Sequence, residues 1–169
     1  SLTATGLVIS SGAGSLMNNG DGTWTYTPTL NDDTSVSFSY FVTDGSLSAA
    51  VSATLDITPI NDAPTTSAVT LAPLAEDSGT RLITQAELLA NAVDVDGPSL
   101  TPTGLVISSG NGSLIDNGDG TWTYTPALND DSSASFSYTV TDGSLSASGS
   151  ATLDITPADE ARAGSEGRL

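Results

Sequence analysis

A long internal repeat is the feature that most constrains how this chain can fold. Residues 1–59 align without gaps on residues 99–157, and 49 of the 59 aligned pairs are identical. The offset of 98 residues is much longer than the unit of a solenoid and close to the roughly 100 residues of an immunoglobulin-like sandwich. Each repeat is therefore expected to be a whole domain.

The repeat also predicts where the domains begin and end. Residues 60–157 contain one complete repeat. Residues 1–59 contain no counterpart of residues 61–98, and we expect them to form a truncated repeat with only the five later strands. Residues 158–169 are predicted to be a C-terminal tail. Because the chain starts without Met and in mid-pattern, we expect it to be part of a longer protein.

Alternating hydrophobicity predicts β-strands. Apolar residues alternate with Ser, Thr or Asp in the second repeat, which is the period of strands with one buried face. Asn-Gly-Asp-Gly before Trp122 is a strong hairpin signal, and Thr84 with Glu87 predicts a capped helical turn or two in 84–91. We expect an all-β, Greek-key, immunoglobulin-like sandwich with seven strands near 66–72, 80–83, 100–109, 113–116, 121–125, 135–142 and 148–156.

The composition limits the partners of the chain. Its formal charge is −17, with three basic residues against twenty Asp and Glu. Such a chain repels nucleic acid and anionic membranes, and no apolar stretch reaches the roughly 20 residues needed to span a bilayer. We therefore expect no nucleic-acid partner and no membrane insertion. With no Cys or His, the chain offers oxygen ligands and not the nitrogen or sulfur ligands that zinc and copper prefer.

The strand order sorts the acidic residues into two groups. Consecutive strands of a sandwich run up and down, so alternate loops meet at the same end of the domain. One end is expected to carry Asn61, Asp62, Asp94, Asp96 and Asp142. The other end is expected to carry Glu76, Asp77, Asp130 and Asp131, together with Asp159 and Glu160.

Stacking of the repeats would bring acidic residues of both repeats together. Head-to-tail stacking would bring Asp32 and Asp33 toward Asp62, Asp94 and Asp96, so that five carboxylates converge. Such a cluster is stable only when some of the carboxylates are protonated or a cation lies among them. Ca²⁺ suits this arrangement because it accepts six to eight oxygen ligands.

Five motifs in a fixed order carry a family resemblance: NDAP at Asn61, ED at Glu76, DVDG at Asp94, NGDGTWTYTP at Asn117 and SFSYTVTDG at Ser135. Together they resemble the cadherin-like, VCBS-type tandem repeats of large bacterial surface proteins and repeats-in-toxin adhesins. The resemblance covers residues 61–157 and, in shortened form, 1–59. It implies a cadherin-like sandwich and an extracellular extender or ligand-binding module at the bacterial cell surface, active in cell adhesion and biofilm formation.

The resemblance also implies calcium at the junctions between neighbouring repeats of the same chain. The ligands it implies are Asn61, Asp62, Glu76, Asp94, Asp96 and Asp142. Residues 1–59 have no counterpart of Glu76, so a junction site around Asn61 would lack one ligand. The second repeat ends in PADEARAG where the first ends in PINDAP, which argues against a further junction after Pro157.

Several residues have simpler interpretations. Asp32–Asp33 and Asp130–Asp131 are expected to cap loops more than to contact metal, and Asp21 and Asp119 to shape hairpin turns. The pairs Trp24 with Tyr26 and Trp122 with Tyr124 alternate with Thr, which favours core packing over a sugar-binding platform.

Other functions stay open at this point. Without His, Cys or Lys, the chain lacks the usual catalytic bases, so we expect no enzymatic activity. Alternative functions are a carbohydrate- or matrix-binding module and a self-assembling subunit. In the second case, strands of another molecule complete residues 1–59 by strand addition, or residues 65–83 fold back onto them.

Overall fold

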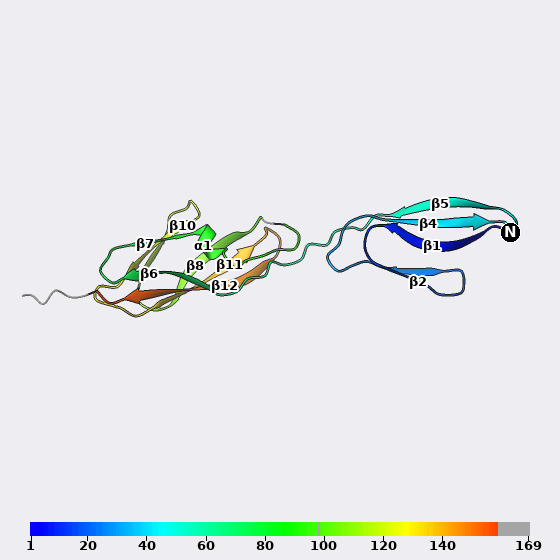
Figure 1. The fold of residues 1–169 in the computed structure, drawn as a ribbon. Helices are drawn as coiled ribbons and strands as arrows, with labels where there is room; N and C mark the ends of the chain where they lie inside the picture. The colour runs from blue at the N-terminus through cyan, green and yellow to red at the C-terminus, as the bar shows by residue number, and fades with distance from the viewer. Residues whose placement is uncertain (98, 159–169) are drawn as a thin grey trace, which may run out of the picture. The chain divides into compact units, whose positions relative to one another are not determined.

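The computed structural model describes residues 1–97 and 99–158. The chain forms two compact units, residues 1–60 (unit 1) and residues from Asn61 onward (unit 2). Unit 1 runs from blue to cyan in Figure 1, and unit 2 continues from green to orange. The predicted C-terminal tail lies outside the described residues apart from Ala158. None of the helical segments described is both long and apolar enough to cross a membrane.

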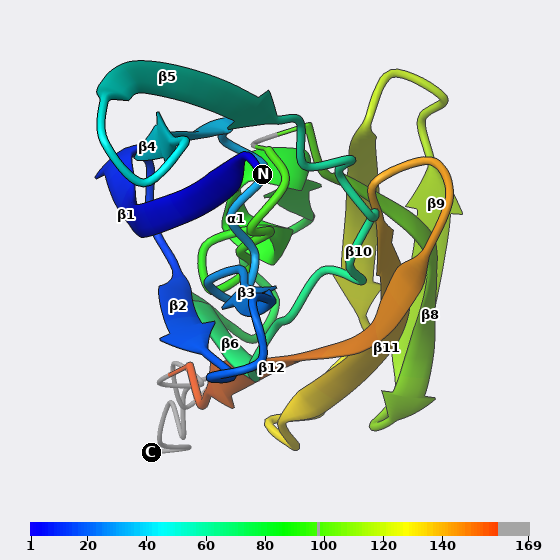
Figure 2. The same ribbon diagram turned by 90° about the vertical axis from the view of Figure 1, so that its right-hand side faces the viewer.

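Unit 2 is a sandwich of two β-sheets. The first sheet has the strand order β6-β12-β11-β8, and the second has the order β7-β10-β9. Figure 2 shows β8 and β11 side by side in the first sheet. The predicted all-β sandwich of seven strands is confirmed. The elements are β6 (Val69–Ala75), β7 (Arg81–Thr84), α1 (Gln85–Leu88), β8 (Thr101–Ser109), β9 (Gly112–Asp116), β10 (Thr121–Pro126), β11 (Ala134–Thr141) and β12 (Ser146–Thr156).

The first and last strands of unit 2 lie next to each other. β6 pairs with β12 in parallel, with Val69 opposite Ala151 and Leu71 opposite Leu153. The other strand pairs described in unit 2 are antiparallel. A parallel pair needs a long connection, and here the other five strands lie between the two partners.

The first strand begins later than its sequence predicts. β6 starts at Val69, whereas alternation predicted a strand over 66–72. Thr65 and Val93 bond each other through both backbone N–H groups, at 2.8 and 2.9 Å, and the Asn91 side chain donates to the Ala68 carbonyl at 2.7 Å. These contacts tie the residues before Val69 to the connection between α1 and β8, so that they do not join β12.

The core of unit 2 lies between its two sheets. Fourteen buried apolar residues form it, and Tyr124 and Phe136 meet edge to face with ring centroids 5.3 Å apart. Trp122 and Tyr124 are buried in this core, so the prediction that they pack inside the domain is confirmed. The short helix α1 closes one side of the core with Leu88. Its capping box at Thr84 and Glu87 is the one that the sequence predicted.

Unit 1 contains the counterparts of the five later strands. They are β1 (Thr3–Ser11), β2 (Ser15–Asn18), β3 (Trp24–Thr27), β4 (Val36–Thr43) and β5 (Ser48–Leu55). They form a sheet in the order β1-β4-β5 and a two-stranded sheet β2-β3. Tyr26 of β3 meets Phe38 of β4 edge to face at 5.5 Å, which is the counterpart of the contact between Tyr124 and Phe136.

Candidate metal centre

Five sequence-predicted residues gather at one end of unit 2, which we call the acidic end: Asn61, Asp62, Asp94, Asp96 and Asp142. The Asn61 side-chain amide donates to Oδ2 of Asp142 at 2.8 Å, although 81 residues separate them. The Asp62 backbone N–H donates to Oδ2 of Asp96 at 2.6 Å. The acidic end therefore joins three separate segments: the start of the unit, the connection from α1 to β8, and the turn from β11 to β12.

Asp94 is the least satisfied residue of the acidic end. Its Oδ1 accepts a 2.9 Å hydrogen bond from the Asp96 backbone N–H. Its Oδ2 is buried and has no hydrogen-bond partner among the described residues. A buried carboxylate oxygen without a partner is costly and calls for an explanation such as a bound ion or water. Asp94 and Asp96 also line an open hollow of about 500 Å³ together with Leu89 and Leu100.

Asp142 is held as a carboxylate by several donors. The Asn61 amide contributes most to lowering its pKa below the usual value, and the Leu145 and Ser144 backbone N–H groups add to this effect. These two N–H groups donate to Oδ1 of Asp142 at 2.7 and 2.6 Å. The residue therefore serves two roles in the structure: it shapes the hairpin turn through Oδ1 and fixes the start of the unit through Oδ2.

Glu76 lies at the opposite end of unit 2. The side chain is only 8% exposed, and its Oε1 accepts a 2.9 Å hydrogen bond from the Ala158 backbone N–H. Its own N–H donates to the Thr156 carbonyl. Strand β12 separates Thr156 from the turn that holds Asp142, and its ten residue steps span about 33 Å. Glu76 and the acidic end therefore cannot bind the same ion.

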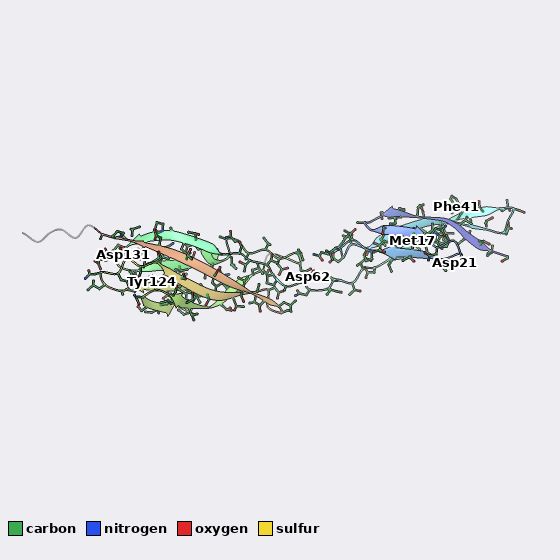
Figure 3. The ribbon with its side chains drawn as sticks, turned by 90° about the horizontal axis from the view of Figure 1, so that it is seen from below. Met17, Asp21, Phe41, Asp62, Tyr124 and Asp131 are labelled. Carbon is green, nitrogen blue, oxygen red and sulfur yellow. The ribbon has the colours of Figure 1, made fainter. Side chains whose placement is uncertain are left out.

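The loop carboxylates have local roles. Asp130 accepts hydrogen bonds from Ser132 and from the Asn111 side chain, and these bonds lower its pKa below the usual value. Asp32 likewise accepts hydrogen bonds from the Thr34 hydroxyl and backbone N–H, and these bonds lower the pKa of that carboxyl. These contacts match the predicted loop caps. Figure 3 shows Asp131 at the end of unit 2 away from Asp62, as strand alternation predicted.

The acidic end is not a preassembled cage. Within the part of the chain that the structure describes, no three His, Cys, Asp or Glu side chains are grouped closely enough to hold a metal ion. The atoms that could bind a metal ion at the acidic end are oxygens of carboxylates, amides and backbone carbonyls, which are the ligands that Ca²⁺ accepts. The predicted approach of Asp32 and Asp33 involves both units and stays a prediction. Sequence reasoning missed the buried Oδ2 of Asp94, because only the folded loop places that oxygen inside.

A family model described as a cadherin-like domain matches residues 1–58 and 60–156. The chain belongs to the cadherin-like domain family. The structure of human protocadherin-24 EC1-2 is 12% identical, with a TM-score of 0.53 over 93% of this chain and 82% of that one. This likeness concerns the fold. Cadherin-like domains 1 to 4 of zebrafish RET are 11% identical, with a TM-score of 0.36 over 93% of this chain and 41% of that one.

One expectation requires correction. The endo-fucoidan hydrolase MfFcnA4 of glycoside hydrolase family 107 is 21% identical, with a TM-score of 0.37 over 90% of this chain. The present chain spans about a quarter of that enzyme's length, 24%. The expectation that the chain has no enzymatic activity is contradicted by such hydrolases among its structural neighbours, and we withdraw it. At this TM-score the likeness assigns no activity to the chain. No curated protein matches the chain.

Proposed function

We propose that this cadherin-like chain is a calcium-binding extender or adhesion module of a bacterial surface adhesin of the VCBS type, working outside the cell. In this proposal, neighbouring repeats of the same protein are its partners, and bound calcium stiffens the array that they form. The observation that carries the proposal is the Oδ2 atom of Asp94, a buried carboxylate oxygen that has no hydrogen-bond partner among the described residues. It lies at the end of unit 2 to which two further segments bring oxygen atoms.

The residues that would hold the ion are those of the acidic end. Asp94 would offer its buried Oδ2, while Asp62, Asp96 and Asp142 would offer carboxylate oxygens and Asn61 its amide oxygen. The ion would supply positive charge to a group of like charges, and so favour one arrangement of the three segments. Glu76 would serve a separate ion at the opposite end, because the length of β12 excludes a shared one.

The present hydrogen bonds at the acidic end fit this role. Hydrogen bonds join Asn61 to Asp142, Asp62 to Asp96, and Asp96 to Asp94. These bonds hold the three segments near each other before an ion binds. The acidic end carries four aspartates in a chain of charge −17, and like charges at one end of a domain repel each other. Calcium binding would remove that repulsion, and we expect it to make the unfolding temperature of unit 2 depend on calcium concentration.

Calorimetry of the whole chain tests the proposal. Calcium at 100 times its dissociation constant should stabilise unit 2 by about 2.7 kcal/mol relative to chelator, and titration calorimetry should detect binding. Asp94→Asn should abolish binding at the acidic end and the stabilisation that this binding contributes, and leave only the binding at Glu76. Asp154→Asn is the matched control, because Asp154 lies exposed on β12 and bonds only Ser133 among the hydrogen bonds described for it. An unfolding temperature that is the same in millimolar calcium and in chelator would overturn the proposal.

A further inference from the structure

The outer face of the sheet β1-β4-β5 in unit 1 carries no charge. Strand β4 lies between β1 and β5 in this sheet (Figure 1). Val36 and Phe38 of β4 are buried, so the residues that alternate with them, from Ser37 to Thr43, lie on the opposite, outer face. None of the three strands contains a charged residue, although the chain has twenty Asp and Glu. The outer face therefore offers mainly Ser and Thr hydroxyls.

Phe41 is an exposed aromatic residue on this outer face. It is 50% exposed, and it lies opposite Thr5 of β1 and Ala50 of β5. The ring lies toward β1, where its Cδ2 atom is 3.8 Å from the position that a Cβ on Gly6 would take. Gly6 has no side chain, and Ala50 has a short one. These two neighbours therefore leave the ring open to solvent.

The same face is open in unit 2, where β6 and β7 are present. Thr139 and Ser148 hold the positions of Phe41 and Ala50 there, and both are exposed. Strand β6 extends that sheet at the edge of β12 and does not cover its outer face. The exposure of position 41 is therefore a property of the whole sandwich. The positions of Phe41 and Ala50 are among the ten of 59 at which the repeats differ, and they face each other across β4 and β5.

An aromatic ring among uncharged hydroxyls suits a neutral sugar. The face of the ring is electron-rich and attracts the C–H groups on one side of a pyranose. Ser39, on the same strand, and Thr5 and Ser52, on the neighbouring strands, can each donate and accept hydrogen bonds with sugar hydroxyls. The face has no charge with which to select an ionic ligand, and the chain's charge of −17 repels acidic polysaccharides.

A protein partner would need a larger apolar area. Protein interfaces bury about 800 Å² on each partner, around a centre that is mainly apolar. On this face, Phe41 and Val8 are the large apolar residues that are exposed, and the positions around them carry hydroxyls or Ala. One ring with a single large apolar neighbour is enough to orient a sugar but too small to form the centre of a protein interface.

We propose that the outer face of unit 1 binds a neutral polysaccharide, with one sugar ring stacked on Phe41 and hydrogen-bonded by the neighbouring hydroxyls. Unit 2 has similar hydroxyls but Thr139 in place of the ring, so only unit 1 has the stacking residue. The proposal goes beyond calcium binding and does not rest on it, because no carboxylate lies on the three strands of this face.

Affinity electrophoresis of the whole chain, run with chelator through gels that contain dextran, mannan or xyloglucan, tests the proposal. At least one of these neutral polysaccharides should slow the chain, and alginate, which is acidic, should not. Phe41→Thr should weaken binding about tenfold or more, since the ring is no longer there to be buried under the sugar. Met17→Thr is the control and should bind like the parent, because Met17 is 61% exposed but lies on β2 (Figure 3).

Four results would overturn the proposal: no slowing by any of the three neutral polysaccharides, equal slowing by alginate, equal slowing of the parent and Phe41→Thr, or an equal loss in Met17→Thr. A transfer experiment tests the face itself. Thr139→Phe with Ser148→Ala gives unit 2 the ring and its small neighbour, at a place where no described atom lies within 4 Å of a Cβ on Gly104. Added to Phe41→Thr, these two changes should restore binding. A chain that still does not bind would overturn the assignment of binding to this face.

Discussion

The hydroxyl of Tyr138 donates a 2.7 Å hydrogen bond to the backbone carbonyl of Leu88 inside unit 2. The bond connects β11 to the end of α1, 50 residues earlier in the chain. The last carbonyls of a helix have no partner within the helix, so the Tyr138 hydroxyl satisfies a group that would otherwise be buried without a hydrogen bond. Burial of the phenol also raises the pKa of Tyr138 above its usual value.

Tyr138→Phe should destabilise unit 2. The change removes the donor and leaves the Leu88 carbonyl buried without a partner, at a cost of about 1–3 kcal/mol. Urea unfolding followed by Trp122 fluorescence in a Trp24→Phe background measures it, because that background leaves one tryptophan, in unit 2. Tyr40→Phe is the matched control in unit 1, where Tyr40 is only half-buried, and should change stability by less. Equal stability of Tyr138→Phe and the parent would show that the bond contributes nothing.

Gly149→Val should also destabilise unit 2. A Cβ at Gly149 would lie 2.4 Å from Cε2 of Tyr138, so the ring must move away from its place in the core. Forcing extra atoms into a packed core costs about 1–3 kcal/mol. Unit 1 has Val51 at the equivalent position, opposite the half-buried Tyr40. Ser148→Val, one residue earlier on the exposed face of β12, is the control and should unfold at the urea concentration of the parent.

Asn61→Ala should raise the pKa of Asp142. The Asn61 amide donates to the charged carboxylate, so its removal disfavours the ionised form, while the Leu145 and Ser144 N–H groups still hold the pKa below its usual value. Because the folded-state pKa is lowered, Asp142 contributes stability above the pKa of the unfolded state and loses it as the pH falls through the folded-state value. In the variant, the part of the folding stability that Asp142 contributes, and that is lost as the pH falls, should therefore be smaller.

Carbon-13 NMR titration of the Asp142 carboxyl group in calcium-free buffer measures this change. Asn117→Ala is a suitable control because the Asn117 side chain bonds Thr121 and Thr123, and not Asp142. The same Asp142 pKa in the parent and in Asn61→Ala would contradict the assignment of the shift to Asn61.

Local sequence signals predicted most of the strands, because they depend on neighbouring residues. The predicted strand over 121–125 corresponds to β10, and the predicted capping pair Thr84 and Glu87 forms as expected. The start of β6 at Val69 could not be read from alternation, since it depends on the bridge between Thr65 and Val93, 28 residues apart. Long-range backbone pairs of this kind leave no periodic signal in the sequence.

For the candidate site, the sequence predicted which residues lie at the same end of the domain, but not how deeply each side chain is buried. The up-and-down course of the strands correctly placed Asn61 with Asp142 and Asp62 with Asp96, because loop positions follow from strand count. The burial of Asp94 Oδ2 was not predictable, since the exposure of one side-chain oxygen depends on the tertiary structure around it. The six proposed calcium ligands divide between two ends of unit 2, and their binding of calcium stays a prediction.

Thr84→Ala should weaken the start of α1 and the adjoining edge of β7. The Thr84 hydroxyl accepts the Glu87 backbone N–H at 3.3 Å, and the Glu87 carboxylate accepts the Thr84 N–H at 2.9 Å and also contacts Arg81. Burial alone would raise the pKa of Glu87, but the bonds from Arg81 and Thr84 outweigh it and the pKa is lowered.

Loss of such an N-cap costs about 0.5–2 kcal/mol, measurable by urea unfolding in the Trp24→Phe background. Thr84→Ser keeps the hydroxyl and should retain most of the stability. If Thr84→Ser were as destabilised as Thr84→Ala, the cost would come from lost methyl packing and not from the cap. A loss of stability in Thr84→Ala that is absent in Thr84→Ser would show that the capping box holds α1 over the core, where Leu88 is fully buried.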